Sequence, residues 1–378
     1  MQKNGKPSSI DVARLACVSQ SAVSRSFTPG ASVSAKTRAK VMTAAAALSY
    51  KPNLIPRIMA TGRSAIVAVV AGGFYNPFFA STLETFVRAL RNAGKQVMLV
   101  HAESDRTLDD VVSELARYRV DAVVTALSIG SQAVADTLAM FNIPIVTLNA
   151  GITGGLIRAV ISDNEGGSAA AAALLVRRGG RCFGYVGGPD SPQQAQRERG
   201  FAEGLAALGH HSYVRAIGDF DYGGGYRAVC EMFARSRPPS SVPDSLFCMN
   251  DLAACGVIDA LRHEFGLRVP EDVMVVGYDD IAMAGWAAYD LTTFNQDIGA
   301  LVAGVMRMLG ETPPAETILR VPPTLVERGS TRPPLCPAEL CPAEAGLSIK
   351  AATPAAADHD GGSAGGPESS DARKAATH

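Results

Sequence analysis

The sequence predicts an α/β protein in which a small all-α head precedes a doubly wound body of two lobes. Two observations predict this architecture. Residues 1–64 hold ten Lys or Arg and one acidic residue, Asp11, so this segment has a net charge of +9 in a chain whose total is −1. From Ala65 onward, short apolar runs alternate with amphipathic stretches, which is typical of parallel sheets covered by helices. The charge division predicts a polyanion-binding head on an acidic body.

The head contains the signals of three short helices. Ser8 is a suitable cap for a helical pattern that runs to Ala16. Ser19 can cap a second helix at residues 20–27, and Ser34 can cap a third at residues 35 to about 50. Three short helices in about 50 basic residues are the outline of a helix-turn-helix DNA-binding unit. The expected head is therefore residues 1–52.

Several segments of the head resemble the lac-repressor family of bacterial transcription regulators. The matching segments are Ile10–Ser19, Ala22–Arg25, Val33-Ser34, Thr37-Arg38 and Leu48–Asn53, without gaps over about 45 residues. The likeness continues more loosely to about Ser330. It implies a cytoplasmic regulator, most simply a repressor, with a body like the periplasmic sugar-binding proteins. That body would bind a small effector between its two lobes.

The resemblance also implies how the head meets DNA. Two heads of a homodimer would occupy a near-palindromic double-stranded operator, and each would place Gln20, Ser21 and Arg25 in the major groove. Ser8 and Ser19 belong to the same expected DNA-binding set.

Two positions of the head depart from the family pattern. Cys17 stands where the family usually has Gly, at a turn that favours a left-handed residue, and this costs about 1 kcal/mol. Ala22 stands where a Thr usually donates to a phosphate. The loss of that contact is expected to weaken binding without changing which sequence is read.

The junction at residues 53–64 is the expected hinge. In the family this stretch becomes a short helix only on the operator, where an apolar side chain enters the minor groove. Met59 occupies the place where Leu is usual, so it is the expected wedge. Because Pro56 is harmless only in a first helical turn, the helix should begin at Ile55 or Pro56 and end near Thr61-Gly62. An unstructured tether is the alternative.

The body, residues 65–330, contains too many apolar runs for one compact sheet, which favours two lobes of five or six strands each. The expected strands are Ala65–Ala71, Gln96–His101, Ala122–Leu127, Ile145–Asn149, Ala159–Ser162, Phe183–Gly187, Tyr213–Ile217, Ser245–Met249 and Met274–Gly277. The helical segments between them include Ser81–Ala93, Asp109–Tyr118, Glu165–Arg178, Gln194–Leu208, Gly224–Arg235 and Asp251–Phe265.

The C-terminal part of the chain falls into two pieces. From about Thr293 an extended apolar stretch, a helix near Ala300–Leu309 and a run at Thr317–Val321 indicate a return to the first lobe. Residues 331–378 are rich in Pro, Ala, Gly and Ser and are expected to be disordered.

Residues at the carboxyl ends of the expected strands predict a ligand site. The resemblance implies that Arg197 contacts the ligand, and the strand-end signature Gly277–Asp280 suggests that Asp279 faces the same cleft. An arginine can grip a carboxylate or a vicinal diol, so a hydroxylated ring, a sugar or a sugar acid, is favoured. The full expected set is Phe78, Phe79, Asn149, Asp163, Arg197, Phe220, Asn250, Asp279 and Gln296.

Some of these residues have a simpler interpretation. Phe78 and Phe79 could be core residues beneath the following helix, and one of two adjacent aromatic side chains usually points inward. Asp163 could be no more than a helix cap.

Catalytic and metal-binding chemistry finds little support in the sequence. It has no Walker loop and no G-x-G-x-x-G, and His210-His211 lack the carboxylate or Cys spacing of a metal site. Seven Cys, irregularly spaced, do not form a disulfide framework. We therefore expect no enzyme activity, no cofactor and no metal. A doubly wound enzyme with an added basic head is the alternative, which the missing phosphate loops disfavour.

Membrane and export signals are also lacking in the sequence. No apolar run reaches the roughly 18 residues that span a bilayer. The N-terminus does not read as a secretory signal. An exported solute-binding protein is therefore disfavoured, and we expect no membrane partner.

Overall fold

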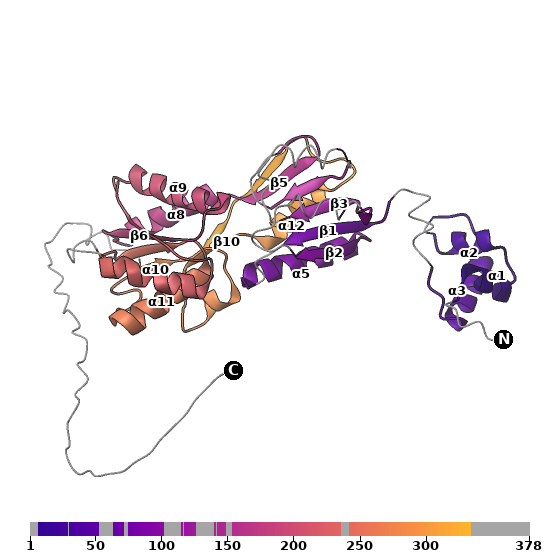
Figure 1. Cartoon of the computed structure of the whole chain (residues 1–378), viewed down its shortest axis with the longest axis horizontal. Helices are drawn as coiled ribbons and strands as arrows, with labels where there is room; N and C mark the ends of the chain where they lie inside the picture. The colour runs from indigo at the N-terminus through magenta and orange to yellow at the C-terminus, as the bar shows by residue number, and fades with distance from the viewer. Residues whose placement is uncertain are drawn as a thin grey trace, which may run out of the picture. The chain divides into compact units, whose positions relative to one another are not determined.

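Figure 1 shows the three helices of the head and the two lobes of the body. In this computed structural model, the described residues are 7–28, 30–52, 63–71, 75–101, 115, 117–125, 140, 142–148, 153–235 and 242–333. The hinge residues 53–62, with Met59, lie outside the described residues, and so do Asn149 and the chain from residue 334.

The three helices of the head are α1 (Ser9–Ala16), α2 (Gln20–Ser26) and α3 (Ala35–Ala47). Each follows a serine whose hydroxyl accepts a backbone N–H three residues on, at Ser8, Ser19 and Ser34. At α1 the side chain of Asp11 also accepts the N–H of Ser8 at 2.9 Å, which completes a capping box. The predicted helix starts and caps are thus confirmed.

Small apolar side chains hold the head together. Val12, Val23 and Val41, one from each helix, are all at most 1% exposed. The rings of Phe27 and Tyr50 meet edge to face with centroids 5.9 Å apart. This packing leaves the polar side of α2 exposed.

The first lobe is built on a sheet of parallel strands in the order β11-β5-β4-β3-β1-β2. Val67 and Val69 of β1 pack on one side, with side chains of α5 and α12, and Ala68 and Val70 belong to the cluster on the other side. The elements are β1 (Ile66–Ala71), α5 (Pro77–Asn92), β2 (Gln96–His101), β3 (Ala122–Thr125), β4 (Ile145–Thr147), β5 (Ile157–Ser162), α12 (Ile298–Met308) and β11 (Ile318–Val321).

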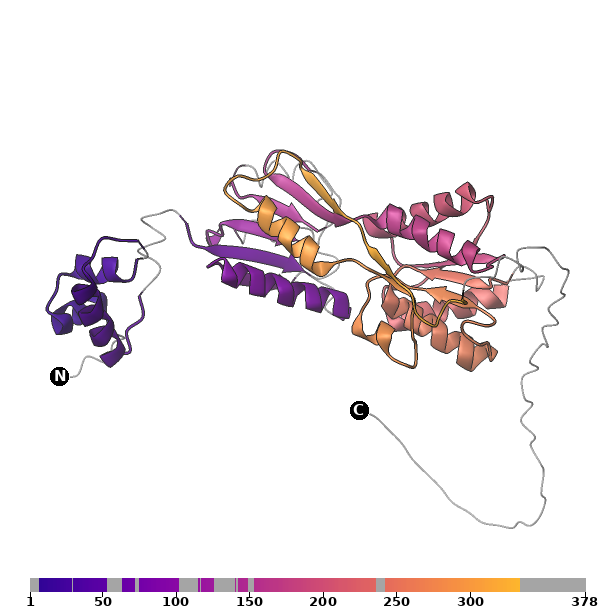
Figure 2. The ribbon, with the colours of Figure 1, turned by 180° about the vertical axis from the view of Figure 1, so that it is seen from behind.

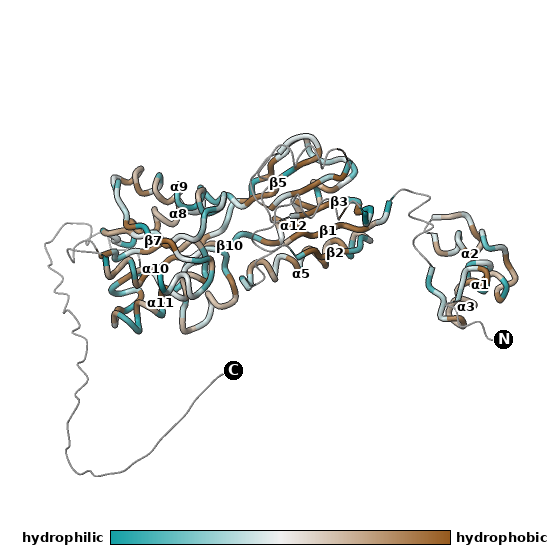
Figure 3. The backbone as a smooth tube through the Cα atoms, in the orientation of Figure 1, coloured by the Kyte–Doolittle hydropathy of each residue, from teal (hydrophilic) through white to brown (hydrophobic). Residues whose placement is uncertain are grey.

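The second lobe has parallel strands in the order β7-β6-β8-β9. Its core clusters lie on the two faces of the sheet, one with α8 and α9 and the other with α10 and α11. The elements are α8 (Asn164–Arg177), β6 (Phe183–Gly187), α9 (Pro192–Ala207), β7 (Val214–Ile217), α10 (Tyr222–Arg235), β8 (Ser245–Cys248), α11 (Asp251–Phe265), β9 (Met274–Val276) and the 3₁₀ turn η2 (Ala282–Gly285). Figure 3 shows the apolar character of β1 and β3 against the mixed colours of the outer helices.

The second sheet is smaller than predicted, with four strands among the described residues instead of five or six. The segment after β9 adds no named strand to this sheet and makes only two isolated parallel bridges, Val276 with Thr292 and Asp279 with Asn295. Instead β10 (Thr293–Asn295) pairs antiparallel with β12 (Thr324–Val326). The reason is connectivity, because this segment must leave the second lobe to reach α12 in the first.

The chain crosses between the lobes at three places: after β5, along β10 and along β12. The return to the first lobe is confirmed, since β11 joins the sheet edge beside β5. Figure 2 shows the orange β10 region running from one lobe to the other. The predicted helix at 109–118 lies mostly outside the described residues.

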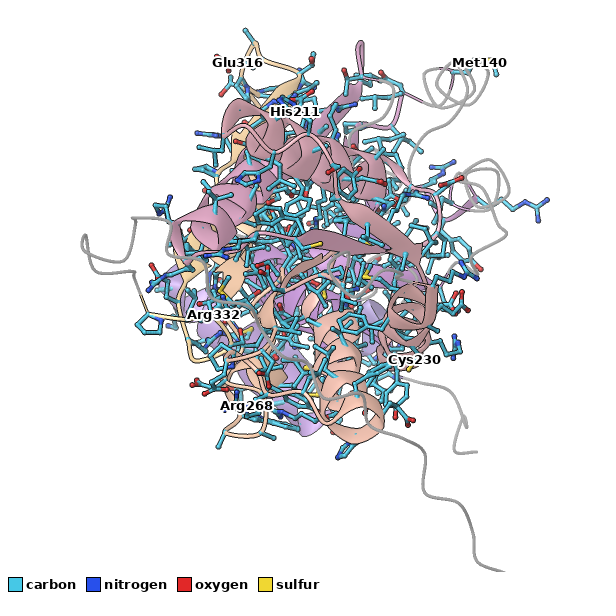
Figure 4. All side chains as sticks on the ribbon, turned by 90° about the vertical axis from the view of Figure 1, so that its left-hand side faces the viewer. Met140, His211, Cys230, Arg268, Glu316 and Arg332 are labelled. Carbon is cyan, nitrogen blue, oxygen red and sulfur yellow. The ribbon has the colours of Figure 1, made fainter. Side chains whose placement is uncertain are left out.

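The body extends slightly beyond its predicted bounds, residues 65–330, at both ends. Ser64, assigned to the hinge, is buried, and its N–H donates to Asp121 Oδ1 at 2.7 Å. Thr331, assigned to the disordered tail, is also buried, and its hydroxyl lies 2.9 Å from that of Thr292. Arg332, labelled in Figure 4, donates Nε to the carbonyl of Pro270 at 3.2 Å. None of the helices in the described part of the chain is long and apolar enough to cross a membrane.

The turn between α1 and α2 has the predicted left-handed residue, because Cys17 has φ 53° and ψ 49°. We expect Cys17→Gly to stabilise the head by about 1 kcal/mol, since glycine has no Cβ to strain this conformation. Hydrogen exchange of the α1 and α2 amides would measure the gain. Cys17→Ala removes the thiol but keeps Cβ, so it should give no gain. An equal gain for alanine would show that the thiol, not the backbone, is the source of strain.

Candidate functional site

A cavity of about 140 Å³ is lined by residues of both lobes. Seven of the nine expected ligand residues line it: Phe78, Phe79, Arg197, Phe220, Asn250, Asp279 and Gln296. Asn149 lies outside the described residues, and Asp163 is not among the lining residues. The structure therefore brings together side chains that are up to 218 positions apart in the sequence, between Phe78 and Gln296.

The first lobe contributes Tyr75, Asn76 and the start of α5. Asn76 caps α5 by accepting the N–H of Phe78 at 2.9 Å, and Pro77 occupies the first turn, where it is well tolerated. The rings of Phe78 and Phe79 meet edge to face at 5.6 Å, and both line the cavity. The side-chain nitrogen Nδ2 of Asn76 donates to Oδ2 of Asp279 in the second lobe at 3.4 Å. Asn76 thus caps α5 and also links the two lobes.

Arg197 on α9 is buried, at 5% exposure, and held on several sides. Its Nε donates to Asn164 Oδ1 at 2.9 Å, and Nη1 donates to the carbonyl of Met249. Nη1 also lies 3.7 Å from Asp279 Oδ1. The guanidinium carbon stands 3.7 Å from the ring centroid of Tyr278, a cation–π arrangement.

The neighbouring Arg199 lies at the surface. Its side chain is about half exposed and donates to Glu165. Two arginines on one helix therefore differ in environment because they lie on different faces of α9.

Asp279 is the centre of the polar contacts. It is 6% exposed and has the unusual φ of 125°. Its Oδ1 accepts Nε2 of Gln296 at 2.6 Å, from the segment that follows β10. Burial raises the pKa of Asp279 to about 6, although the charge of Arg197 and the bonds from Asn76 and Gln296 oppose the shift.

Asp163 and Asn250 both serve as helix caps. Asp163 accepts the N–H of Gly166 at the start of α8, as the simpler cap interpretation predicts, and it is not among the lining residues, so its contact with a ligand stays a prediction. Asn164 lies at the cavity instead. Asn250 lines the cavity, but its Oδ1 accepts the N–H of Ala253 and its Nδ2 donates to the carbonyl of Phe220. It therefore also holds the Phe220 loop in place.

Gln193 is a cavity residue that the sequence did not single out. Its Nε2 is buried without a hydrogen-bond partner, and the residue lines the cavity near the start of α9. A glutamine in a first helical turn is ordinary, so no sequence pattern marks it. Its position relative to Arg197, one turn later on the same helix, is the signal that could have found it.

In the head, the expected base-reading residues lie on the exposed side of α2. Gln20, Ser21 and Arg25 are exposed, and Gln20 Nε2 donates to Ser9 Oγ at 2.9 Å. The hydroxyls of Ser8 and Ser19 act as helix caps. Their contacts with DNA, like those of the three exposed residues, stay predictions.

Comparison with known proteins decides the family. A model of bacterial regulatory proteins of the lacI family matches residues 10–53, and a periplasmic binding protein-like domain matches residues 172–331. The HTH-type transcriptional repressor PurR of Proteus mirabilis (strain HI4320) is 30% identical over 331 residues, which are 85% of this chain and 95% of PurR. The chain belongs to the lacI family of bacterial regulatory proteins.

Other relatives agree with this assignment. The transcriptional regulator CelR of Thermobifida fusca is 30% identical, over 84% of this lacI-family chain and 95% of CelR. A Lac repressor dimer bound to operator and the anti-inducer ONPF has a TM-score of 0.78 at 26% identity, covering 87% of this chain and all of that one. A CelR–cellobiose complex has a TM-score of 0.63 at 30% identity, covering 86% and 99%. The predicted fold class is confirmed, and the relatives are regulators, not enzymes.

Behind the cavity of this lacI-family chain, Asp251 connects three segments. It is fully buried at the first position of α11 and does not line the cavity. One carboxylate oxygen accepts the hydroxyl of Thr293 on β10, and the other accepts the N–H of Ile281 at 2.9 Å. Burial, together with the nearby charge of Asp279, raises the pKa of Asp251 to about 7.

This raised pKa predicts a pH dependence of stability. The folded carboxyl of Asp251 binds its proton more tightly than the unfolded chain does, so the free energy of unfolding should fall as pH rises from about 4 to about 7. Asp251→Asn should lose the part of this slope that Asp251 causes, because an amide does not ionise. Urea denaturation across this pH range would measure it. Asp259→Asn on the same helix is the control, and an unchanged slope in Asp251→Asn would contradict the assignment.

Proposed function

We propose that this chain is a sequence-specific DNA-binding repressor, controlled by a small polar effector. It acts in the cytoplasm as a homodimer on a near-palindromic operator. The observation that carries the proposal is the bond from Asn76 in one lobe to Asp279 in the other, inside a cavity that also holds Arg197. A ligand that contacts Asp279 must alter a contact that joins the lobes.

The control mechanism follows from this contact. A ligand shifts a conformational equilibrium only through differential contacts with its two states. A ligand that replaces the bonds of Asn76 or Gln296 to Asp279 changes the relative stability of two lobe arrangements. The first strand, β1, begins directly after the hinge, so the first lobe transmits the change towards the heads.

The size and lining of the cavity favour a single hydroxylated ring, a sugar or a sugar acid. A cavity of about 150 Å³ accommodates a benzene ring, and this cavity is about 140 Å³. The aromatic rings of Phe78 and Phe220 can cover the faces of such a ring, and polar side chains lie beside them. The CelR–cellobiose complex supports a sugar, since its TM-score with this chain is 0.63.

The proposal that the head binds DNA predicts a loss of operator affinity that depends on the base sequence. Duplexes selected from a random pool would first define the operator. Arg25→Ala should then cost about 1–3 kcal/mol on this operator and flatten discrimination at one base pair, because an exposed arginine on α2 can grip a guanine edge. Lys6→Ala is the control and should weaken all sequences alike. Competition gel shifts measure both. Equal loss on specific and random DNA would remove Arg25 from the base-reading set.

The effector half predicts a loss of response without a loss of DNA binding. Asp279→Ala should abolish the effect of ligand on operator affinity, because the contacts of Asn76 and Gln296 with the carboxylate disappear. Without ligand the variant should still bind the operator specifically, at an affinity that the loss of the Asn76 contact between the lobes can shift but that ligand no longer changes. Fluorescence anisotropy of labelled operator, titrated with a panel of sugars, sugar acids and nucleosides, measures the response. An undiminished response at the same ligand concentration would contradict the cleft assignment.

A further inference from the structure

The charges in the cavity are balanced by the protein itself. Among the described residues that line it, only Arg197 and Asp279 carry a formal charge. Their side chains lie 3.7 Å apart, and each is at most 6% exposed. The pair contributes no net charge to a space where charges are weakly screened.

The guanidinium of Arg197 already makes several contacts within the protein. Its Nε and Nη1 donate to Asn164 and Met249, and its face covers Tyr278. An anionic ligand that recruited this cation would draw it from Asp279. The buried carboxylate would then lack its compensating charge, which is strongly unfavourable.

The solvent edge of the cavity carries negative charge. Tyr75 lines the cavity from the first lobe and is 60% exposed. Burial and the charges of Asp221 and Asp219 in the second lobe raise the pKa of its phenol. Phe220, between these two acids in sequence, also lines the cavity. Asp219 is paired with Arg227 at 2.7 Å, and Asp221 accepts the N–H of Gly224. An approaching anion therefore meets the charge of Asp221 near Tyr75, whereas Arg227 compensates that of Asp219.

Gln193 supplies a further hydrogen-bonding group of the cavity, and this group is neutral. The buried Nε2 of Gln193 has no partner and can donate to a hydroxyl or carbonyl oxygen. We propose that the cavity selects a neutral hydroxylated ring and rejects its anionic counterpart. This inference rests on the proposed function, because it concerns the effector of that same cavity. It favours a sugar over the sugar acid.

Asp279→Asn tests the charge balance directly. This variant gives the cavity a net positive charge with almost no change of shape, and asparagine tolerates a positive φ better than most residues. The probes are matched pairs, galactose with galacturonate and glucose with glucuronate, together with inorganic phosphate. Calorimetry at about pH 7.5 should show that Asp279→Asn binds the uronates about tenfold or more tightly than wild type does.

Asp280→Asn is the matched control. Asp280 is adjacent in sequence and loses the same formal charge, but it pairs with Arg328 at 2.7 Å and does not line the cavity. It should show no gain. A uronate or phosphate that binds wild type as tightly as Asp279→Asn, no gain in Asp279→Asn, or an equal gain in Asp280→Asn would each overturn the proposal.

A measurement on wild type alone covers the case in which Asp279→Asn fails to fold. The pKa of Asp279 is about 6, so its protonation near pH 5.5 should raise uronate affinity relative to pH 7.5. The charged or titratable groups that face it are Arg197, Tyr278 and Asp251, whereas Asn76 and Gln296 are neutral. Unchanged or weaker uronate binding at the lower pH would contradict the proposal.

The proposed function is tested by a different readout. The neutral sugars are titrated into the operator complex, and their effect on operator affinity reports on effector control. A failure there counts against a sugar effector and leaves the comparison of uronate binding between variants intact.

Discussion

The contact between Arg197 and Asp279 is the interaction on which the rest of the body depends. Two buried charges are unfavourable unless each is compensated and hydrogen-bonded. The partners that meet this need come from separate elements: Asn164 at the start of α8, Met249 after β8, Asn76 before α5 and Gln296 after β10. Satisfying one ion pair therefore sets the positions of both lobes and of a crossing segment. The same requirement places a polar cavity where the lobes meet.

The loop that carries Asp279 is held in an unfavourable conformation by contacts behind the cavity. Asp279 and Asp280 have φ values of 125° and 55°, which non-glycine residues rarely adopt. Asp251 accepts the N–H of Ile281, and Arg328 donates to Asp280 at 2.7 Å. Such strain persists only where the surroundings over-determine it. Asp251, which does not line the cavity, thus helps to fix the loop that carries Asp279.

Predictions from the sequence succeeded where the signal is local and were incomplete where it is not. The serine caps of the head and the left-handed Cys17 depend on hydrogen bonds and sterics within a few residues, so they could be located. Most strands were found within two residues, because a buried parallel strand is a continuous apolar run. Asn164, next to the predicted Asp163, lines the cavity, since sequence alone does not tell which of two adjacent polar residues turns inward. No local sequence pattern distinguishes Gln193, and its place in the cavity lining depends on residues that are its neighbours only in space.

By itself, the sequence determined the order of elements and the basic three-helix head, and the family resemblance added four of the polar residues that line the cavity: Arg197, Asn250, Asp279 and Gln296. The order of elements and the head follow from capping, hydrophobic periodicity and local charge, which act over short stretches of chain. Only the tertiary structure decided that β10 pairs with β12, that Thr331 belongs to the second lobe, and that Arg197 is neutralised by Asp279. These outcomes depend on which distant segments share a buried space. The energy of a charge or a hydrogen bond there is set by its neighbours in space rather than in sequence.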